Sequence, residues 1–153
     1  MPPATRHCKD GRRRGSHEHT EFTFLGFTFR ARGMRSRHGD VFTGFGPAAS
    51  KDAIKKMGGQ VKSWRFHRLT GHTIGEIALA ISPVIRGWMQ YYGRFYESEL
   101  YPLLYRINAY LVRWMRKKYR RLRPLKKAEK AWKRLMSQYP TFFPHWQWVS
   151  SFW

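Results

Sequence analysis

The stretch LYPLLYRINAYLVRWMRKKYRRLRP, residues 100–124, decides the fold because it carries two different stripes along one predicted helix. Apolar residues recur in it at spacings of three and four, the period of an amphipathic helix with one buried face. The helix is predicted to begin near Ser98 and to end before Pro124, because proline disrupts a helix interior. The buried stripe comprises Leu100, Leu103, Leu104, Ile107, Leu111 and Trp114.

The second stripe of this helix is basic and lies about a third of a turn away from the first. Between Glu99 and Glu129 the sequence has ten Lys or Arg residues and no acidic one. A merely solvated helix usually mixes charges of both signs, which gain pairs at i and i+4. We therefore interpret the stripe as a face that follows a nucleic-acid backbone, with a plain solvated face as the alternative. Its members are Arg106, Arg113, Lys117 and Arg120.

The whole chain shares this positive bias. Its 153 residues include 30 Lys and Arg against nine Asp and Glu, a formal net charge of +21. Such a field attracts polyanions, and the planar arginine fork suits phosphate oxygens, so nucleic acid is the expected ligand. A membrane surface is the rival ligand. It is disfavoured because the basic faces are backed by a predicted core and not by exposed Leu and Phe.

Helical periodicity first appears after Ser50, which is a favourable N-cap. Apolar residues recur at helical spacing from Ile54 to Trp64 and predict a helix with one buried side. Three lysines fall together on another face of this helix, and we expect them to contact RNA. They are Lys51, Lys55 and Lys62.

A capping box at Thr73–Glu76 predicts the start of a short helix, which Pro83 is expected to end. Pro83 is also expected to open the next helix, where Trp88, Met89 and Tyr92 are interpreted as core. Three neighbours in SPVIRGWMQYYGRF, residues 82–95, are candidate RNA contacts. They are Arg86 and Arg94, for phosphate or for a structural bond to a carbonyl, and Tyr91, for stacking on a base.

The N-terminal part predicts β structure. EFTFLGFTFR, residues 21–30, alternates Phe with Thr, as in a strand with one buried face. The alternation changes phase at Leu25–Gly26, which we interpret as a bulge. DVFTGF, residues 40–45, follows a turn at His38–Gly39, so the two runs are predicted to pair as an antiparallel hairpin. A hairpin seldom stands alone in water and must pack on the helices or on a partner.

The predicted fold is therefore mainly α, with an N-terminal antiparallel β-hairpin. A last helix is expected at about 126–137, followed by an irregular aromatic tail that packs down. The expected organisation is a flexible basic lead-in (1–20), the hairpin (21–48), a helical domain (49–146) and the aromatic tail (147–153). Three arginines of the lead-in are also candidate RNA contacts: Arg12, Arg13 and Arg14.

The sequence contains no visible catalytic constellation, and we predict no cofactor and no metal site. Cys8 with His17–Glu18–His19 matches no zinc spacing, and a single cysteine excludes an internal disulfide. No phosphate-binding glycine loop, nucleophile elbow or aspartate pair for two metal ions is present. No apolar run of about 18 residues exists to span a membrane. The absence of a secretory apolar segment favours a reduced, cytoplasmic location.

Five segments, taken in order, resemble the C-terminal part of group II intron-encoded reverse transcriptase/maturases. They are HCKDGRRRGSHEHT (7–20), FTFLGFTFR (22–30), FGPAAS (45–50), ISPVIRGWMQYYGRF (81–95) and FPHW (143–146). The resemblance covers nearly the whole chain. It implies that the hairpin is the last element of the polymerase palm. It also implies that residues from about 50 to 146 form the maturase-specific thumb, called domain X.

The resemblance implies a function in binding the host intron RNA, stabilising its folded form and helping it to splice. In the intact family the thumb also grips the template–primer duplex. Two departures matter: the chain has no Tyr-Ala-Asp-Asp motif for the catalytic metals, and with Cys8 alone it has no cysteine-rich endonuclease domain. A smaller departure is Ser82, where the family more often has asparagine. A truncated or degenerate reading frame, or a piece of a split gene, is therefore expected.

Two other functions stay open at this point. In the first, the chain is a subunit that forms a polymerase only with a separate chain that supplies the fingers and palm. In the second, it is a pseudogene product that folds poorly and binds RNA only through its charge. Cooperative melting distinguishes a folded domain from the second of these. The sequence does not determine the oligomeric state or the identity of the intron.

Overall fold

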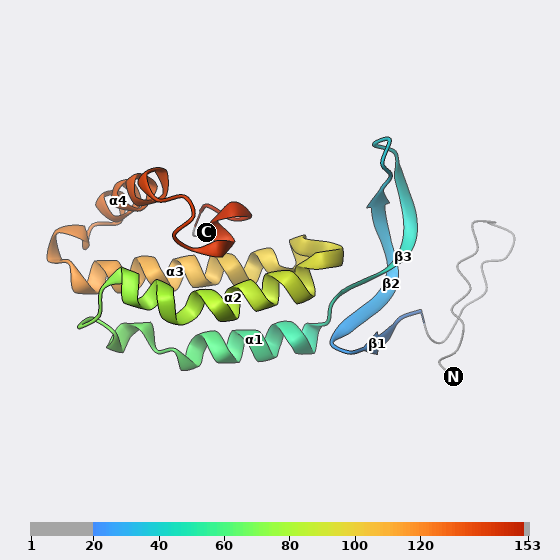
Figure 1. Cartoon of the computed structure of the whole chain (residues 1–153), viewed down its shortest axis with the longest axis horizontal. Helices are drawn as coiled ribbons and strands as arrows, with labels where there is room; N and C mark the ends of the chain where they lie inside the picture. Colours follow the sequence, from blue (N-terminus) through green and yellow to red (C-terminus); the bar gives the residue numbers. More distant parts are fainter. Residues whose placement is uncertain (1–19, 152–153) are drawn as a thin grey trace, which may run out of the picture.

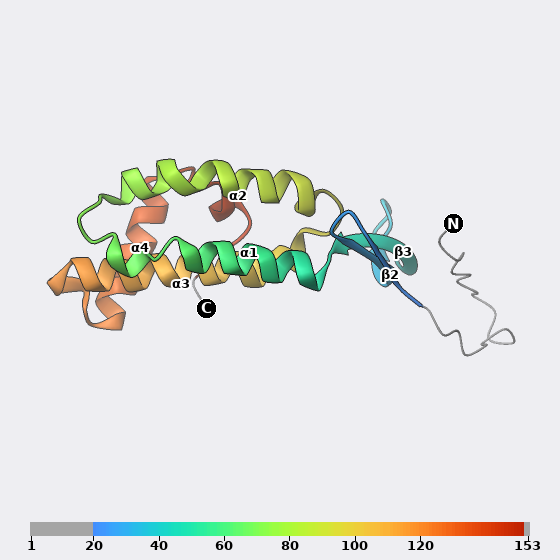
Figure 2. The ribbon, with the colours of Figure 1, turned by 90° about the horizontal axis from the view of Figure 1, so that it is seen from below.

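The computed structural model describes residues 20–151 and shows a helical bundle with a small β-sheet at one end (Figures 1 and 2). The sheet comes first in the chain, and its three strands are antiparallel in the order β1-β2-β3. They are β1 (Phe22–Phe24), β2 (Phe27–Arg35) and β3 (Val41–Ala49). The prediction of a mainly α fold with an N-terminal antiparallel hairpin is confirmed.

Four α-helices follow the sheet in the described range, 20–151. They are α1 (Lys51–Ser63), α2 (Ile74–Tyr96), α3 (Tyr101–Lys118) and α4 (Leu125–Gln138). Short 3₁₀ helices join or follow them, namely η2 (Phe66–Arg68), η3 (Glu97–Leu100), η4 (Arg120–Leu122) and η5 (Pro144–Gln147). Helices α1, α2 and α3 run side by side with alternating chain direction (Figures 1 and 2). Figure 1 places α1 on one side of the α2–α3 pair and α4 with the C-terminal tail on the other.

The predicted bulge at Leu25–Gly26 is wrong, because these two residues form the turn between β1 and β2. Both have positive φ (49° and 81°), the conformation of a two-residue hairpin turn whose twist matches that of the flanking strands. Phe24 therefore pairs with Phe27, and the change of phase in the sequence marks a reversal of the chain. The second turn lies at His38–Gly39, as predicted, with Gly39 at φ 92°.

The sheet is joined to the helices around Phe27, which is buried. Its ring lies 5.1 Å from Tyr91, 5.5 Å from Tyr92 and 5.7 Å from Phe95, measured between ring centroids. The Tyr91 hydroxyl also donates to the Leu25 carbonyl at 3.1 Å. These aromatic contacts pack the turn end of the β1–β2 hairpin against α2 and give it support that a hairpin lacks alone in water.

Both predicted helix starts are confirmed. Ser50 Oγ accepts a hydrogen bond from the Ala53 N–H at 3.1 Å, which caps α1. At α2, Thr73 Oγ1 accepts from the Glu76 N–H, and the Glu76 carboxylate accepts from the Thr73 N–H at 2.6 Å. The backbone hydrogen bond from Thr73 lowers the pKa of Glu76 from its usual value.

The predicted break at Pro83 is wrong, because α2 continues through it as one helix of 23 residues. Proline removes the hydrogen bond to the carbonyl of residue 79. Pro83 is exposed, and Leu79 is 80% exposed, so this side of α2 faces solvent, where water can satisfy that carbonyl. The buried side of α2 carries Ile77, Ile81 and Ile85 and keeps its packing.

The apolar stripe predicted for α3 is confirmed, since all six of its residues are buried. The predicted boundaries are too wide. Residues before Tyr101 form η3, and α3 ends at Lys118, where Tyr119 turns extended (φ −105°, ψ 106°). Arg116 Nε donates to the Arg123 carbonyl at 2.8 Å and holds the following segment against the helix end. Arg120 therefore lies on η4 and not on the basic stripe of α3.

The aromatic tail packs down, as predicted, and Asn108 of α3 fastens it. Asn108 Nδ2 donates to the carbonyls of Val149 (3.4 Å) and Ser151 (2.7 Å). Its Oδ1 therefore accepts, from His145 Nε2 at 2.7 Å and from Trp146 Nε1 at 3.2 Å. Asn108 and His145 are fully buried, and burial lowers the pKa of His145 to about 3.

This burial predicts that the fold loses stability in mild acid. His145 binds a proton near pH 6.5 when the chain is unfolded but only near pH 3 when it is folded. The contribution of neutral His145 to the free energy of unfolding is therefore fully present above pH 6.5. Below pH 6.5 the free energy of unfolding falls by about 1.4 kcal/mol per pH unit. Urea unfolding at pH 7.5 and pH 5 measures this loss. The variant His145→Gln cannot titrate and should lose much less, and an equal loss in both proteins would contradict the assignment.

Candidate nucleic-acid interface

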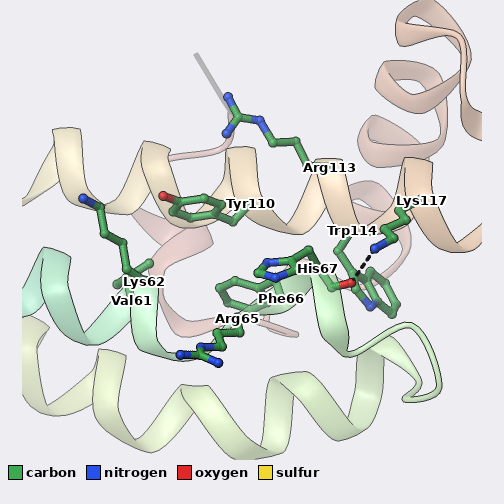
Figure 3. A pocket seen from close by; sticks show the side chains of 9 residues that line it. All are labelled: Val61, Lys62, Arg65, Phe66, His67, Tyr110, Arg113, Trp114 and Lys117. Atoms are coloured by element: carbon green, nitrogen blue, oxygen red, sulfur yellow. Dashed lines mark hydrogen bonds between the residues drawn. The ribbon is translucent and has the colours of Figure 1, made fainter.

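A cleft of about 460 Å³ lies between the C-terminal end of α1, η2 and the C-terminal half of α3. No Asp or Glu lines it. Its cationic side chains are Lys62, Arg65, Arg113 and Lys117, and its rings are those of Phe66, His67, Tyr110 and Trp114 (Figure 3).

The backbone of Arg65 creates the floor of this cleft. Arg65 follows the end of α1 in the left-handed conformation (φ 46°, ψ 49°), and its N–H donates to the Lys62 carbonyl at 3.2 Å. Glycine is the usual residue where a helix ends in this way, because a side chain there costs about 1–2 kcal/mol. The reversal directs η2 beneath α3. An arginine at a strained position beside a cleft is a reason to suspect that its side chain is used.

The end of α3 fixes the connection between α1 and α2 by three hydrogen bonds. Trp114 Nε1 donates to the Leu69 carbonyl at 2.8 Å, and Lys117 Nζ donates to the His67 carbonyl at 2.9 Å. Lys118 Nζ donates to the His72 carbonyl. The floor of the cleft is therefore attached to the same helix that supplies its opposite wall.

The rings of the cleft differ in their accessibility. Phe66 and Trp114 are 3% and 1% exposed and belong to the hydrophobic core. Tyr110 is half-buried and stacks on Phe66, with 6.0 Å between the ring centroids. The Arg113 guanidinium lies 5.8 Å from the centroid of Tyr110. Tyr110 is thus an aromatic surface that is backed by the core and bordered by a cation.

None of the four cations of the cleft has an acidic partner among residues 20–151, and three of them have no hydrogen-bond partner there either. The charged groups of Lys62, Arg65 and Arg113 make no hydrogen bond and no ion pair within the part of the chain that the structure describes. Arg32 shows the contrast, because it pairs with Glu99 at 2.6 Å where the sheet meets η3. Unpaired cations in an acid-free cleft are available to phosphate oxygens.

The structure brings together three of the predicted contacts, Lys62, Arg113 and Lys117, in this cleft. Arg106 lies along the same contact between α1 and α3, since its Nη1 is 3.2 Å from the point where a Cβ on Gly58 would stand. Arg120 is exposed on η4 and does not line the cleft.

The other two lysines of α1 that were predicted to contact RNA, Lys51 and Lys55, are exposed but do not line the cleft. Lys51 borders a groove at the junction of α1 and the sheet, together with Glu21, Asp52 and Glu99. These carboxylates make that groove less favourable for an anion than the cleft. Lys55 is exposed on α1 and lines neither site.

Arg86 and Arg94 line a second groove, of about 440 Å³, between α2 and η5. Trp148 packs against Gly93 there, in space that a side chain on Gly93 would occupy. This groove shares no lining residue with the cleft. Tyr91 is 49% exposed, and its hydroxyl is used to dock the hairpin. The roles of these three residues in RNA binding stay predictions.

Several residues of the N-terminal lead-in lie outside the described residues. They are the three arginines predicted to contact RNA, Arg12, Arg13 and Arg14, and the candidate metal group of Cys8 with His17–Glu18–His19. Between residues 20 and 151, no three His, Cys, Asp or Glu side chains come close enough to hold a metal ion. In the same range, no helix has the length and apolar character needed to span a membrane.

Sequence reasoning missed Arg65, His67 and Tyr110. The run SWRFHR, residues 63–68, combines cations and rings directly after a helix, which is the signal that was available. This run lines the cleft only because the chain reverses direction at Arg65. That reversal needs a positive φ, and an arginine in a sequence does not predict a positive φ. Tyr110 falls between the apolar and basic stripes of α3, so periodicity alone did not assign it.

Comparison with known proteins identifies the family of the chain. Residues 54–139 match the family described as the group II intron, maturase-specific domain. The searches of curated proteins and of solved structures gave no significant match. The matched region is more than half of the chain and contains every residue that lines the cleft. The chain therefore belongs to the group II intron maturase-specific domain family, whose members are parts of reverse transcriptase/maturase proteins.

Proposed function

We propose that the chain binds group II intron RNA through the cleft between α1, η2 and α3, and that this binding assists folding and splicing of the intron. One observation carries the proposal: Lys62, Arg65 and Arg113, which have no ion-pair partner among residues 20–151, all line one acid-free cleft. Family membership supports the intron as the source of the RNA.

The energetics of this surface favour a backbone-tracking contact. A net charge of +21 attracts any polyanion, and each cation that reaches a phosphate releases counterions. Charge does not choose one RNA over another, so recognition of the intron depends on its shape and on exposed bases. The hydrogen bonds that attach the Phe66–Leu69 backbone to α3 fix the floor of the cleft, which lowers the ordering cost of binding.

Assistance in splicing follows from binding alone and requires no catalytic group. A protein that binds the folded intron more tightly than the unfolded one shifts the RNA toward the folded state. The size of the shift equals the difference between the two binding free energies. Multiple turnover of chemistry by the protein is therefore not part of this function.

A second candidate function is a subunit that completes a polymerase whose fingers and palm are a separate chain. The sheet favours it, because several large apolar side chains there stay in solvent. They are Phe24 (61% exposed), Leu25 (68%), Val41 (76%) and Phe42 (42%). This function predicts nucleotide incorporation on a primed template only after mixing with such a chain. Incorporation that does not respond to mixing would exclude it.

The cleft predicts a selective effect of charge removal. Replacing Lys62, Arg65 and Arg113 with Gln should weaken RNA binding and lower the log–log salt slope by about 2 to 3 units, slightly less than one per lost phosphate contact. Lys117 is left unchanged because its amine holds η2. Fluorescence anisotropy at several salt concentrations measures the slope.

The matched control removes the same charge from α4, where Lys126, Lys127 and Lys130 are exposed and make no ion pair among residues 20–151. Their replacement with Gln should change affinity and slope by less than half as much. Equal effects of the two triple variants would mean that charge, and not the cleft, determines binding.

The strain at Arg65 predicts opposite effects on stability and on binding. Arg65→Gly removes the cost of a side chain at φ 46° and should raise the free energy of unfolding by up to about 1 kcal/mol. The same change should weaken RNA binding, because it removes a cation of the cleft. Urea unfolding and anisotropy on one preparation measure both effects.

Leu25→Gly is the control for this experiment. Leu25 has nearly the same backbone conformation, with φ 49°, but lies at the sheet, away from the cleft. It should gain stability to a similar degree and leave RNA affinity unchanged. Unaltered RNA binding by Arg65→Gly would remove Arg65 from the interface.

A further inference from the structure

We propose that the cleft holds one unpaired nucleotide, with its base stacked on Tyr110 and its phosphate bound by the cations at the rim. This inference rests on the proposed function and specifies the RNA chemistry that the cleft selects. The ligand is a planar base joined to a phosphate. A loop or single strand of RNA supplies this group, and so does a free nucleoside monophosphate.

The size of the cleft favours an unpaired base over a duplex. Its volume of about 460 Å³ falls within the range of about 300–1,000 Å³ that is typical of small-ligand sites. Bases within a double helix are stacked on each other, so a duplex can only lie across the rim. An unpaired base is free to leave its strand and enter.

Tyr110 is prepared to receive a base. Its ring is supported by the buried Phe66, at 6.0 Å and an interplanar angle of 20°, so little ordering is needed on binding. Its hydroxyl has no hydrogen-bond partner among residues 20–151. Figure 3 shows the Tyr110 ring extending from α3 toward Lys62, with the Arg113 side chain pointing away from Phe66 and His67.

Arg113 links stacking to phosphate binding. Its guanidinium now lies 5.8 Å from the Tyr110 ring centroid, a loose cation–π contact without any carboxylate partner in the described residues. An entering base takes the place of the guanidinium against the ring. The displaced guanidinium is then free to bind the phosphate of the same nucleotide, next to Lys62.

Stacking of this kind accepts any base, because every base has a π-face. The cleft therefore recognises the unpaired state of a nucleotide and not its sequence. For intron RNA, this selects loops, bulges and single-stranded junctions over helical segments.

The test compares two RNAs with equal numbers of phosphates: a hairpin with 2-aminopurine in its unpaired loop, and a blunt duplex. Tyr110→Leu, which keeps an apolar side chain against the core, should weaken hairpin binding about tenfold and change duplex binding by less than twofold. Tyr110→Phe keeps the ring and should bind both as the wild type does. Tyr139→Leu, an exposed tyrosine outside the cleft, should also have no effect.

Fluorescence of the 2-aminopurine gives a reading that does not depend on any variant. Stacking on Tyr110 should quench it when the wild-type protein binds, and quenching should disappear in Tyr110→Leu. Wild-type binding without quenching overturns the inference even if Tyr110→Leu fails to fold. Adenosine monophosphate, added at millimolar concentration as a competitor, shows whether a free nucleotide can occupy the cleft. Loss of quenching means that the cleft accepts the free nucleotide. Unchanged quenching means that the nucleotide must be part of an RNA.

The outcomes separate this inference from the proposed function. If Tyr110→Leu weakens hairpin and duplex equally, or neither, the cleft does not select unpaired nucleotides, although RNA binding through its cations can stand. If the wild-type protein binds neither RNA, the proposed function fails, and this inference fails with it.

Discussion

The buried face of α3 lies at the centre of one hydrophobic cluster that also contains residues of α1, α2, α4 and the C-terminal tail. Full burial of a side chain such as Leu104 or Ile107 contributes about 1.5–3 kcal/mol, so rotation of α3 about its axis would expose several such side chains at once. The orientation of α3 is therefore fixed. As a consequence, Tyr110 and Arg113 line the cleft that forms where α3 meets α1 and η2.

Stability and binding make different demands on this cleft. Stability requires that Phe66 and Trp114 stay buried in the hydrophobic core. The Trp114 indole N–H also donates to the Leu69 carbonyl. Arg65 instead keeps a strained backbone, and with Lys62 and the other cations it concentrates positive charge in an acid-free site, which an unliganded fold would not favour. Such local costs, carried by a well-packed core, are typical of functional sites.

Local signals in the sequence predicted most of the fold. Ser50 and Thr73 begin helices through their own side chains, and the stripe of α3 has a period that only a helix satisfies. Features that depend on tertiary structure were wrong or missed. The helix α2 continues through Pro83 because the side of the helix that carries Pro83 faces solvent. Arg65 lies at the cleft because its backbone has a positive φ, which the presence of an arginine in a sequence does not predict. Tyr91 docks the hairpin, a contact 66 residues away in sequence.

Ultraviolet crosslinking of the wild-type protein to intron RNA, followed by mass spectrometry of the crosslinked peptides, tests the location of the interface most directly. If the cleft binds RNA, the crosslinks concentrate in residues 62–67 and 110–117, which lie far apart in sequence and meet at the cleft. They should decrease together in the variant that lacks the charges of Lys62, Arg65 and Arg113. Crosslinks confined to α4 or to the sheet, with none in either segment, would contradict this interface.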